Sequence, residues 1–138
     1  MKLITALQLA GLSHLGLMAA GALMPRAVRL SEHVRTLPPF IRRLFWVYYT
    51  FIGLFLVGFG ALSFFLAPQL ASGSALARAV CGFLAVFWTL RLFVAAMVFD
   101  VRPYLTNRFW KLGYHATNVV FVLLPAIYVR AAFAGGVR

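Results

Sequence analysis

Acidic side chains and cysteine are nearly absent from this chain. Its 138 residues include one Asp, one Glu and one cysteine, against a total of thirteen Lys and Arg residues. Cys81 alone excludes an intramolecular disulfide, a CxxC redox pair and a thiolate zinc site, so we interpret it as a small packing residue. The scarcity of carboxylates also argues against hydrolytic catalysis and proton-coupled export. We therefore expect no catalytic residue, no metal and no cofactor.

Charged residues of both signs are also scarce. They make up 11% of the sequence, hydrophobic residues make up 64%, and the mean hydropathy is +0.94. A typical soluble domain is roughly half apolar and a quarter charged. The formal net charge of +11 does not indicate a nucleic-acid partner, because the basic residues punctuate apolar runs instead of gathering on one water-facing surface. The composition predicts an integral membrane protein.

Long apolar runs are abundant. Four of them reach the roughly 20 residues that a membrane-spanning helix needs. They are Leu3 to Met24, Leu44 to Ala67, Ala79 to Phe99, and Leu112 to Phe133. We predict an all-α, four-helix transmembrane bundle that forms a single domain over residues 1–138, with a kink at Pro125. The first run also begins like a signal peptide, but it is longer than the roughly 7 to 15 residues of a secretory apolar region.

The loops between these runs carry most of the positive charge. The two loops at residues 25–43 and 100–111 hold eight Lys and Arg residues, and the opposite side of the membrane holds four. Lys and Arg accumulate in short cytoplasmic loops. We therefore expect both basic loops to lie in the cytoplasm and both termini to lie outside.

The first basic loop has the pattern of an amphipathic helix. In "PRAVRLSEHVRTLPPFIRR" apolar residues recur at steps of three and four, until Pro38 and Pro39 interrupt the pattern. We expect a short interfacial helix between the first and second spans, with arginines that contact anionic lipid headgroups. These arginines are Arg26, Arg29, Arg35, Arg42 and Arg43. The alternative is that they only set the topology.

Arg91 stands inside the third apolar run, in "AVFWTLRLFVAAMVFD". At about 1.5 Å per residue it lies roughly 13 Å from Asp100, near the bilayer midplane and on the opposite face of the helix. Partners for Arg91 must therefore come from other helices. We predict that Arg91 belongs to a buried polar network or ligand site. Its other members are His14, His115, Asn118 and Trp88.

This group of residues admits three interpretations. In the first, it is a clamp that fixes helix register in a non-catalytic, lipid-associated or accessory subunit. In the second, Arg91 holds a small molecule, lipid or quinone for transport or a membrane reaction. In the third, His14 and His115 ligate a haem, which a difference in depth of roughly 9 Å disfavours. Small residues beside His14 also permit a protein partner or a homo-oligomer.

Two blocks of the sequence, "LPPFIRRLFWVYYTFIG" and "LAVFWTLRLFVAAMVFD", resemble the signatures of an uncharacterised family of small four-helix bacterial inner-membrane proteins. The likeness covers the middle of the chain. It implies a location in the bacterial inner (cytoplasmic) membrane, and it implies no activity, cofactor or catalytic residue.

Overall fold

The computed structural model describes residues 2–98, 103 and 105–134, and over these residues it contains helices and no strand. The prediction of an all-α protein is confirmed. The helices are α1 (Leu3–Ala27), α2 (Leu30–Arg35), α3 (Pro39–Phe65), α4 (Ala67–Leu70), α5 (Ala75–Met97) and α6 (Arg108–Ala134). Four of them, α1, α3, α5 and α6, are long and apolar enough to cross a membrane. The prediction of four spanning helices is therefore also confirmed.

α1 begins at Leu3 as predicted, but α3, α5 and α6 begin four or five residues earlier than the apolar runs predict. α3 begins at Pro39 and not at Leu44, because a proline in the first helical turn has no N–H that needs an acceptor and its φ already suits a helix. α5 begins at Ala75, where the Ser74 hydroxyl accepts a hydrogen bond from the Ala77 N–H at 3.2 Å. Proline and serine thus place helix starts inside segments that hydropathy assigns to loops.

The interfacial helix is shorter than predicted. Only Leu30–Arg35 forms α2, because α1 runs on to Ala27 and α3 already begins at Pro39. Arg29, the residue directly before α2, has a φ of 48° in the left-handed region. That conformation costs a residue with a Cβ atom about 1 kcal/mol. The chain therefore turns sharply at an arginine where glycine or asparagine is the usual choice.

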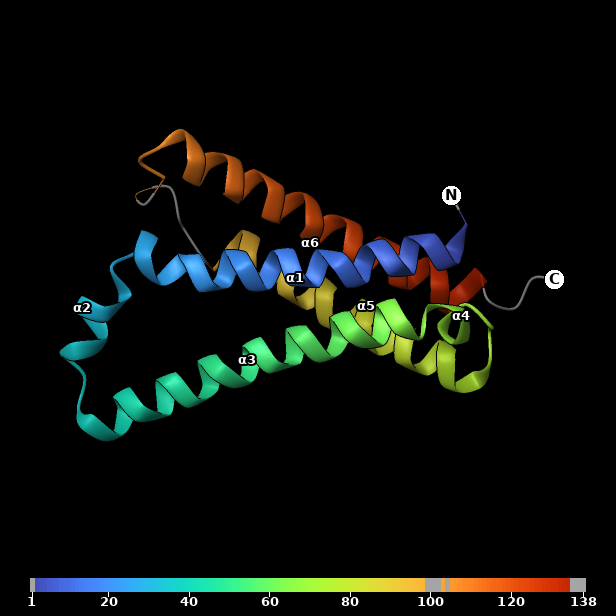
Figure 1. Cartoon of the computed structure of the whole chain (residues 1–138), viewed down its shortest axis with the longest axis horizontal. Coiled ribbons are helices and arrows are strands. Elements are labelled where there is room, and N and C mark those ends of the chain that lie inside the picture. Colours follow the sequence, from blue (N-terminus) through green and yellow to red (C-terminus); the bar gives the residue numbers. More distant parts are fainter. Residues whose placement is uncertain (1, 99–102, 104, 135–138) are drawn as a thin grey trace.

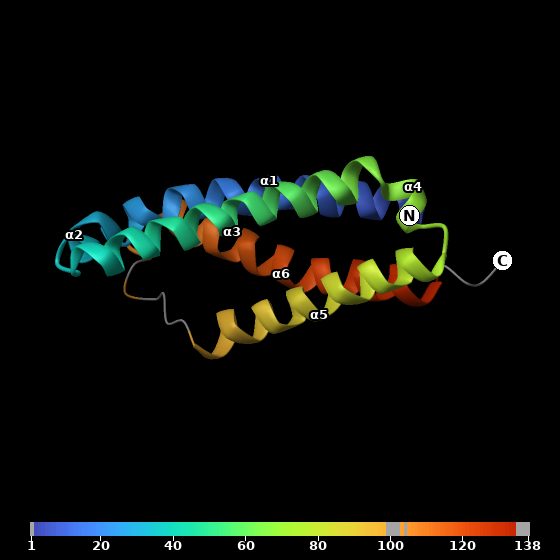
Figure 2. The ribbon, with the colours of Figure 1, turned by 90° about the horizontal axis from the view of Figure 1, so that it is seen from below.

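The long helices associate as two pairs of sequence neighbours. The most extensive pairings are α1 with α3 and α5 with α6, and contacts between α1 and α6 join the two pairs. The start of α1 and the end of α6 lie at one end of the molecule beside α4, and α2 lies at the other end (Figure 1). We call these the α4 end and the α2 end. In both views the helices spread apart toward the α2 end (Figures 1 and 2).

Two glycines allow α1 and α3 to cross closely. A Cβ atom added to Gly11 would lie 2.8 Å from the Gly60 carbonyl oxygen and 2.8 Å from the Phe64 backbone nitrogen. A Cβ atom added to Gly60 would lie 3.0 Å from the Cβ of His14. Small residues at such a crossing let two backbones approach, which is a main source of helix association in membranes.

A proline and a tyrosine join α1 to α3 again near the α2 end. Pro25 lies in the last turn of α1 and has no N–H, so the carbonyl of Gly21 loses its usual donor four residues ahead. The Tyr49 hydroxyl of α3 donates a hydrogen bond to this carbonyl. Since an unsatisfied backbone group costs several kcal/mol in hydrocarbon, Tyr49 offsets the cost of the proline.

The buried core occupies only the half of the bundle next to α4. Toward the α2 end, the last buried residues are Leu17 on α1, Gly60 on α3, Trp88 on α5 and Phe121 on α6. Beyond them, the described residues of all four long helices are exposed or half-buried. At 1.5 Å per residue this coreless part measures about 13 Å on α5, about 15 Å on α1, about 19 Å on α6 and about 31 Å on α3, so its length differs from helix to helix.

Candidate functional site

His14 lies where α1 and α3 cross and is fully buried. Its Nδ1 donates a hydrogen bond to the Ala10 carbonyl at 2.7 Å, because a carbonyl can only accept. The other ring nitrogen, Nε2, has no hydrogen-bond partner among the described residues. Rings of Phe59, Trp88 and Tyr128 surround the imidazole, at centroid distances of 6.5, 5.1 and 6.4 Å. His14 thus brings α1 into contact with an aromatic cluster from the three other long helices.

A second polar contact lies in the same core, between α3 and α6. The Ser63 and Tyr128 hydroxyl oxygens are 2.5 Å apart, and both side chains are fully buried. The sequence alone does not reveal this pair. Ser63 is the one serine of the second apolar run, but no pattern in the sequence connects it to a tyrosine 65 positions later. The pair joins the two helix pairs through a hydrogen bond shielded from water.

Arg91 lies just beyond the core, toward the α2 end. It follows Trp88 by three residues on α5, and its guanidinium carbon is 5.4 Å from the centroid of the Phe121 ring. Phe121 in turn lies 5.9 Å from Trp88. The Arg91 side chain is exposed. Asp100, which the helical spacing disfavours as a partner, lies outside the described residues, as does residue 99, the predicted end of the third span.

His115 and Asn118 are less enclosed than His14. His115 is exposed and its ring lies 5.6 Å from that of Tyr114, and Asn118 is half-buried. Histidines that share a haem must face each other across it. His14 is enclosed by rings while His115 is on an exposed face, so the geometry does not favour that interpretation. In the described part of the chain, no three His, Cys, Asp or Glu side chains are grouped so that they could hold a metal ion.

The five predicted site residues are therefore only partly brought together. His14 and Trp88 are in contact, and Phe121 connects Trp88 to Arg91. A shared network that includes His115 and Asn118 stays a prediction. Phe121 was not identified from the sequence, because a phenylalanine in an apolar run carries no signal of its own.

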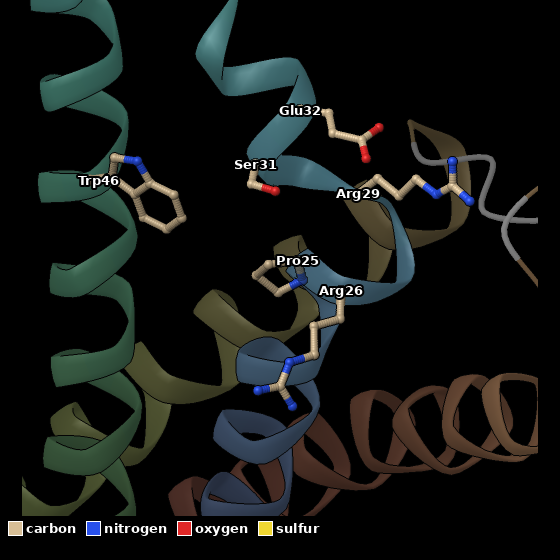
Figure 3. Close-up of a pocket in the computed structure, with 6 residues that line it drawn as sticks. All are labelled: Pro25, Arg26, Arg29, Ser31, Glu32 and Trp46. Atoms are coloured by element: carbon tan, nitrogen blue, oxygen red, sulfur yellow. The ribbon is translucent and has the colours of Figure 1, made fainter.

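The basic loop forms a pocket of about 380 Å³ at the α2 end. Its lining residues are Pro25, Arg26, Arg29, Ser31, Glu32 and Trp46. The Trp46 ring of α3 faces Pro25 and Ser31 across the pocket, whereas the side chains of Arg29 and Glu32 point away from Trp46 (Figure 3). The pocket thus combines one aromatic wall with two arginines and one glutamate.

A further pocket of about 370 Å³ lies between α3 and α5 and is lined by apolar side chains alone. Its lining residues are Phe59, Leu62, Ala79, Val80, Phe83 and Leu84. Phe83 is 60% exposed, so this groove opens to the outside of the bundle. Such a surface suits a lipid chain and offers no group for chemistry.

Four spanning helices, an apolar exterior and a short basic turn define a multi-pass membrane protein. Comparison with protein-family models, with curated proteins and with solved structures finds no match for the chain.

Proposed function

We propose that this protein is a non-catalytic, lipid-associated membrane protein whose α2 end binds anionic phospholipid headgroups. The pocket lined by Arg26, Arg29 and Trp46 is the observation that carries the proposal. Arginine provides planar donors that fit a phosphate, and tryptophan settles at the membrane–water interface. The role is that of an accessory or lipid-organising subunit.

The conformation of Arg29 supports a role for its side chain. The residue holds a left-handed backbone, with φ 48°, that glycine would adopt without strain. Strained positions of this kind concentrate where function and not stability selects the residue. Arg35 and Arg43 are also exposed at this end, and Arg42 is half-buried, so the positive charge extends beyond the pocket.

Replacing two pocket arginines should weaken the preference for anionic lipid. We expect the full-length double variant Arg26→Gln/Arg29→Gln to lose about thirtyfold in that preference, since each arginine near a charged surface contributes about 1 kcal/mol. The measurement is native mass spectrometry of protein released from nanodiscs that contain phosphatidylglycerol and phosphatidylcholine. Raising the salt from about 0.1 M to 1 M should reduce the preference of the wild type, because the Debye length falls from about 10 Å to about 3 Å.

The matched control removes two charges at the other end. Lys2 and Arg130 are both exposed near the α4 end, so Lys2→Gln/Arg130→Gln lowers the net charge equally. This variant should keep the wild-type lipid preference. Equal losses in both double variants would mean that net charge alone attracts the lipid, and the proposed site would then be rejected.

We further propose that the α2 end faces the cytoplasm of a bacterial cell and that both termini lie outside. The positive charge of the loops supports this orientation. In intact cells, a membrane-impermeant thiol reagent should label Ser72→Cys, in the turn after α4, and should spare Ser31→Cys in α2. Both serines are exposed, and Cys81 is fully buried, so the native cysteine contributes little signal. Labelling of Ser31→Cys from outside would reverse the orientation.

A further inference from the structure

The pocket at the α2 end contains a carboxylate beside its arginines. Glu32 is the one glutamate of the sequence, and it lines this pocket together with Arg26, Arg29 and Trp46. Its side chain is exposed, so it does not serve the packing of the core. A carboxylate at a site for an anion alone would weaken binding, because like charges repel each other. The position of Glu32 is therefore not explained by a ligand that carries only negative charge.

The Glu32 carboxylate is close to Arg29 along the chain but is not neutralised by it. The Glu32 N–H donates to the Arg29 carbonyl at 3.0 Å, which places the two residues one turn apart. Within residues 2–98, 103 and 105–134, Glu32 forms no ion pair. Figure 3 shows the side chains of Arg29 and Glu32 on the same side of the pocket, both directed away from Trp46. One cation and one carboxylate thus lie at the same edge of the pocket.

We infer that this edge binds the headgroup of an aminophospholipid, with its phosphate on Arg29 and its primary ammonium on Glu32. A guanidinium donates charge-assisted hydrogen bonds to a phosphate, and an ammonium donates them to a carboxylate. In an ethanolamine headgroup the ammonium follows the phosphate ester by two carbons, so neighbouring side chains can hold both groups. Phosphatidylethanolamine and phosphatidylserine share this unit. The inference rests on the proposed binding of headgroups at the α2 end and names the second group that the headgroup carries.

The direction of Glu32 also decides which kind of ammonium fits. A quaternary ammonium, as in phosphatidylcholine, has no N–H to donate and is typically recognised by a cage of aromatic rings. The pocket offers one such ring, that of Trp46, and Glu32 points away from it. A group that binds the carboxylate gains from each N–H that it has. A primary ammonium is therefore preferred over its methylated forms.

Stepwise methylation of the headgroup tests this inference. Phosphatidylethanolamine and its monomethyl, dimethyl and trimethyl forms have the same net charge, and the number of N–H donors falls by one at each step until phosphatidylcholine has none. The full-length protein is released from nanodiscs that contain these lipids in equal amounts with identical acyl chains, and the retained lipids are counted by native mass spectrometry. Retention should fall at each step, by about fivefold over the series, because an exposed charged pair contributes up to about that factor.

Substitutions of Glu32 assign the effect to its carboxylate. Glu32→Gln keeps the length of the side chain and should make the retention of all members of the series equal. Glu32→Asp keeps a carboxylate and should retain part of the preference. Asp100→Asn, which removes the other acidic side chain of the sequence, changes the net charge as much as Glu32→Gln does and should leave the order intact. Because Glu32 is exposed, neither of its substitutions disturbs the core.

A second pair of lipids distinguishes the two sources of the ammonium. Phosphatidylserine and phosphatidylglycerol have equal net charge, and only the first carries an ammonium. The wild type should prefer phosphatidylserine, and Glu32→Gln should not. A gain equal to that of phosphatidylethanolamine over phosphatidylcholine would show recognition of the shared unit, and a larger gain would assign the pocket to the serine headgroup.

Equal retention of the whole methylation series by the wild type would overturn the inference, as would an order that persists in Glu32→Gln. Retention that rises with methylation would place the ammonium on Trp46 and would also overturn it. Failure of the proposed function has a different signature, which is equal retention of phosphatidylglycerol and phosphatidylcholine by the wild type. If phosphatidylglycerol is preferred while the methylation series is retained equally, only the aminophospholipid inference fails.

Discussion

Gly11→Ala should be the most damaging single-methyl substitution in this protein. The added Cβ would lie 2.8 Å from the Gly60 carbonyl oxygen and the Phe64 backbone nitrogen. Neither backbone can move without separating α1 from α3, and overpacking of this kind costs about 3 kcal/mol. The loss should appear as a lower midpoint when the protein, refolded in mixed micelles, is unfolded by titration with a denaturing detergent.

Gly16→Ala is the matched control for this substitution. Gly16 lies on the same helix, and a Cβ added there would meet no atom within 4 Å. Alanine is the better helix former by roughly 0.5 to 1 kcal/mol, so this variant should be as stable as the wild type or more stable. If both variants lost the same stability, the close crossing of α1 and α3 would not be the cause.

Trp88 should be the side chain whose truncation costs most. It is 2% exposed and contacts the rings of His14 on α1 and Phe121 on α6. Its neighbour Phe87, whose ring it also contacts, contacts Phe59 on α3. Trp88→Ala should therefore lower the unfolding free energy by about 3 to 5 kcal/mol in the same titration. Phe93→Ala on the same helix should have little effect, because Phe93 is 58% exposed and lipid replaces the lost contacts.

Trp88→Phe distinguishes the contribution of the aromatic ring to stability from that of the indole N–H. The indole N–H has no hydrogen-bond partner among the described residues, and such a group costs about 1 to 3 kcal/mol when buried. Phenylalanine removes this cost and keeps most of the ring, so stability should be unchanged or higher. A loss above about 1 kcal/mol would show that the indole N–H has a partner in the membrane.

The four spans could be predicted from the sequence because an isolated apolar run in hydrocarbon has few ways to satisfy its backbone other than a helix. Helix ends were harder to predict. Read from its N-terminal end, the amphipathic pattern stops at Pro38 and Pro39. The same Pro39 is the first residue of α3. The short α2 follows from this conflict, since both neighbouring helices extend into the loop that was assigned to it.

The candidate site was predictable only where a polar residue stands inside an apolar run. His14 and Arg91 can be found in that way, but the residues that connect them cannot. The rotation of α6 turns Phe121, Leu124 and Tyr128 toward the core and leaves His115 exposed. The sequence gives the depth of each residue along its helix. Depth alone does not determine how the helix is rotated about its axis. The end of the core at Trp88 is likewise a property of helix crossing and not of composition.

The pairing of sequence neighbours has a consequence for how the protein is made. α1 meets α3 as soon as the second span leaves the ribosome and enters the membrane, and the Gly11 crossing and the Tyr49 contact need no later part of the chain. The aromatic cluster around His14 is completed only when α5 and α6 arrive. During synthesis the first hairpin therefore exposes His14 toward lipid until the second hairpin covers it.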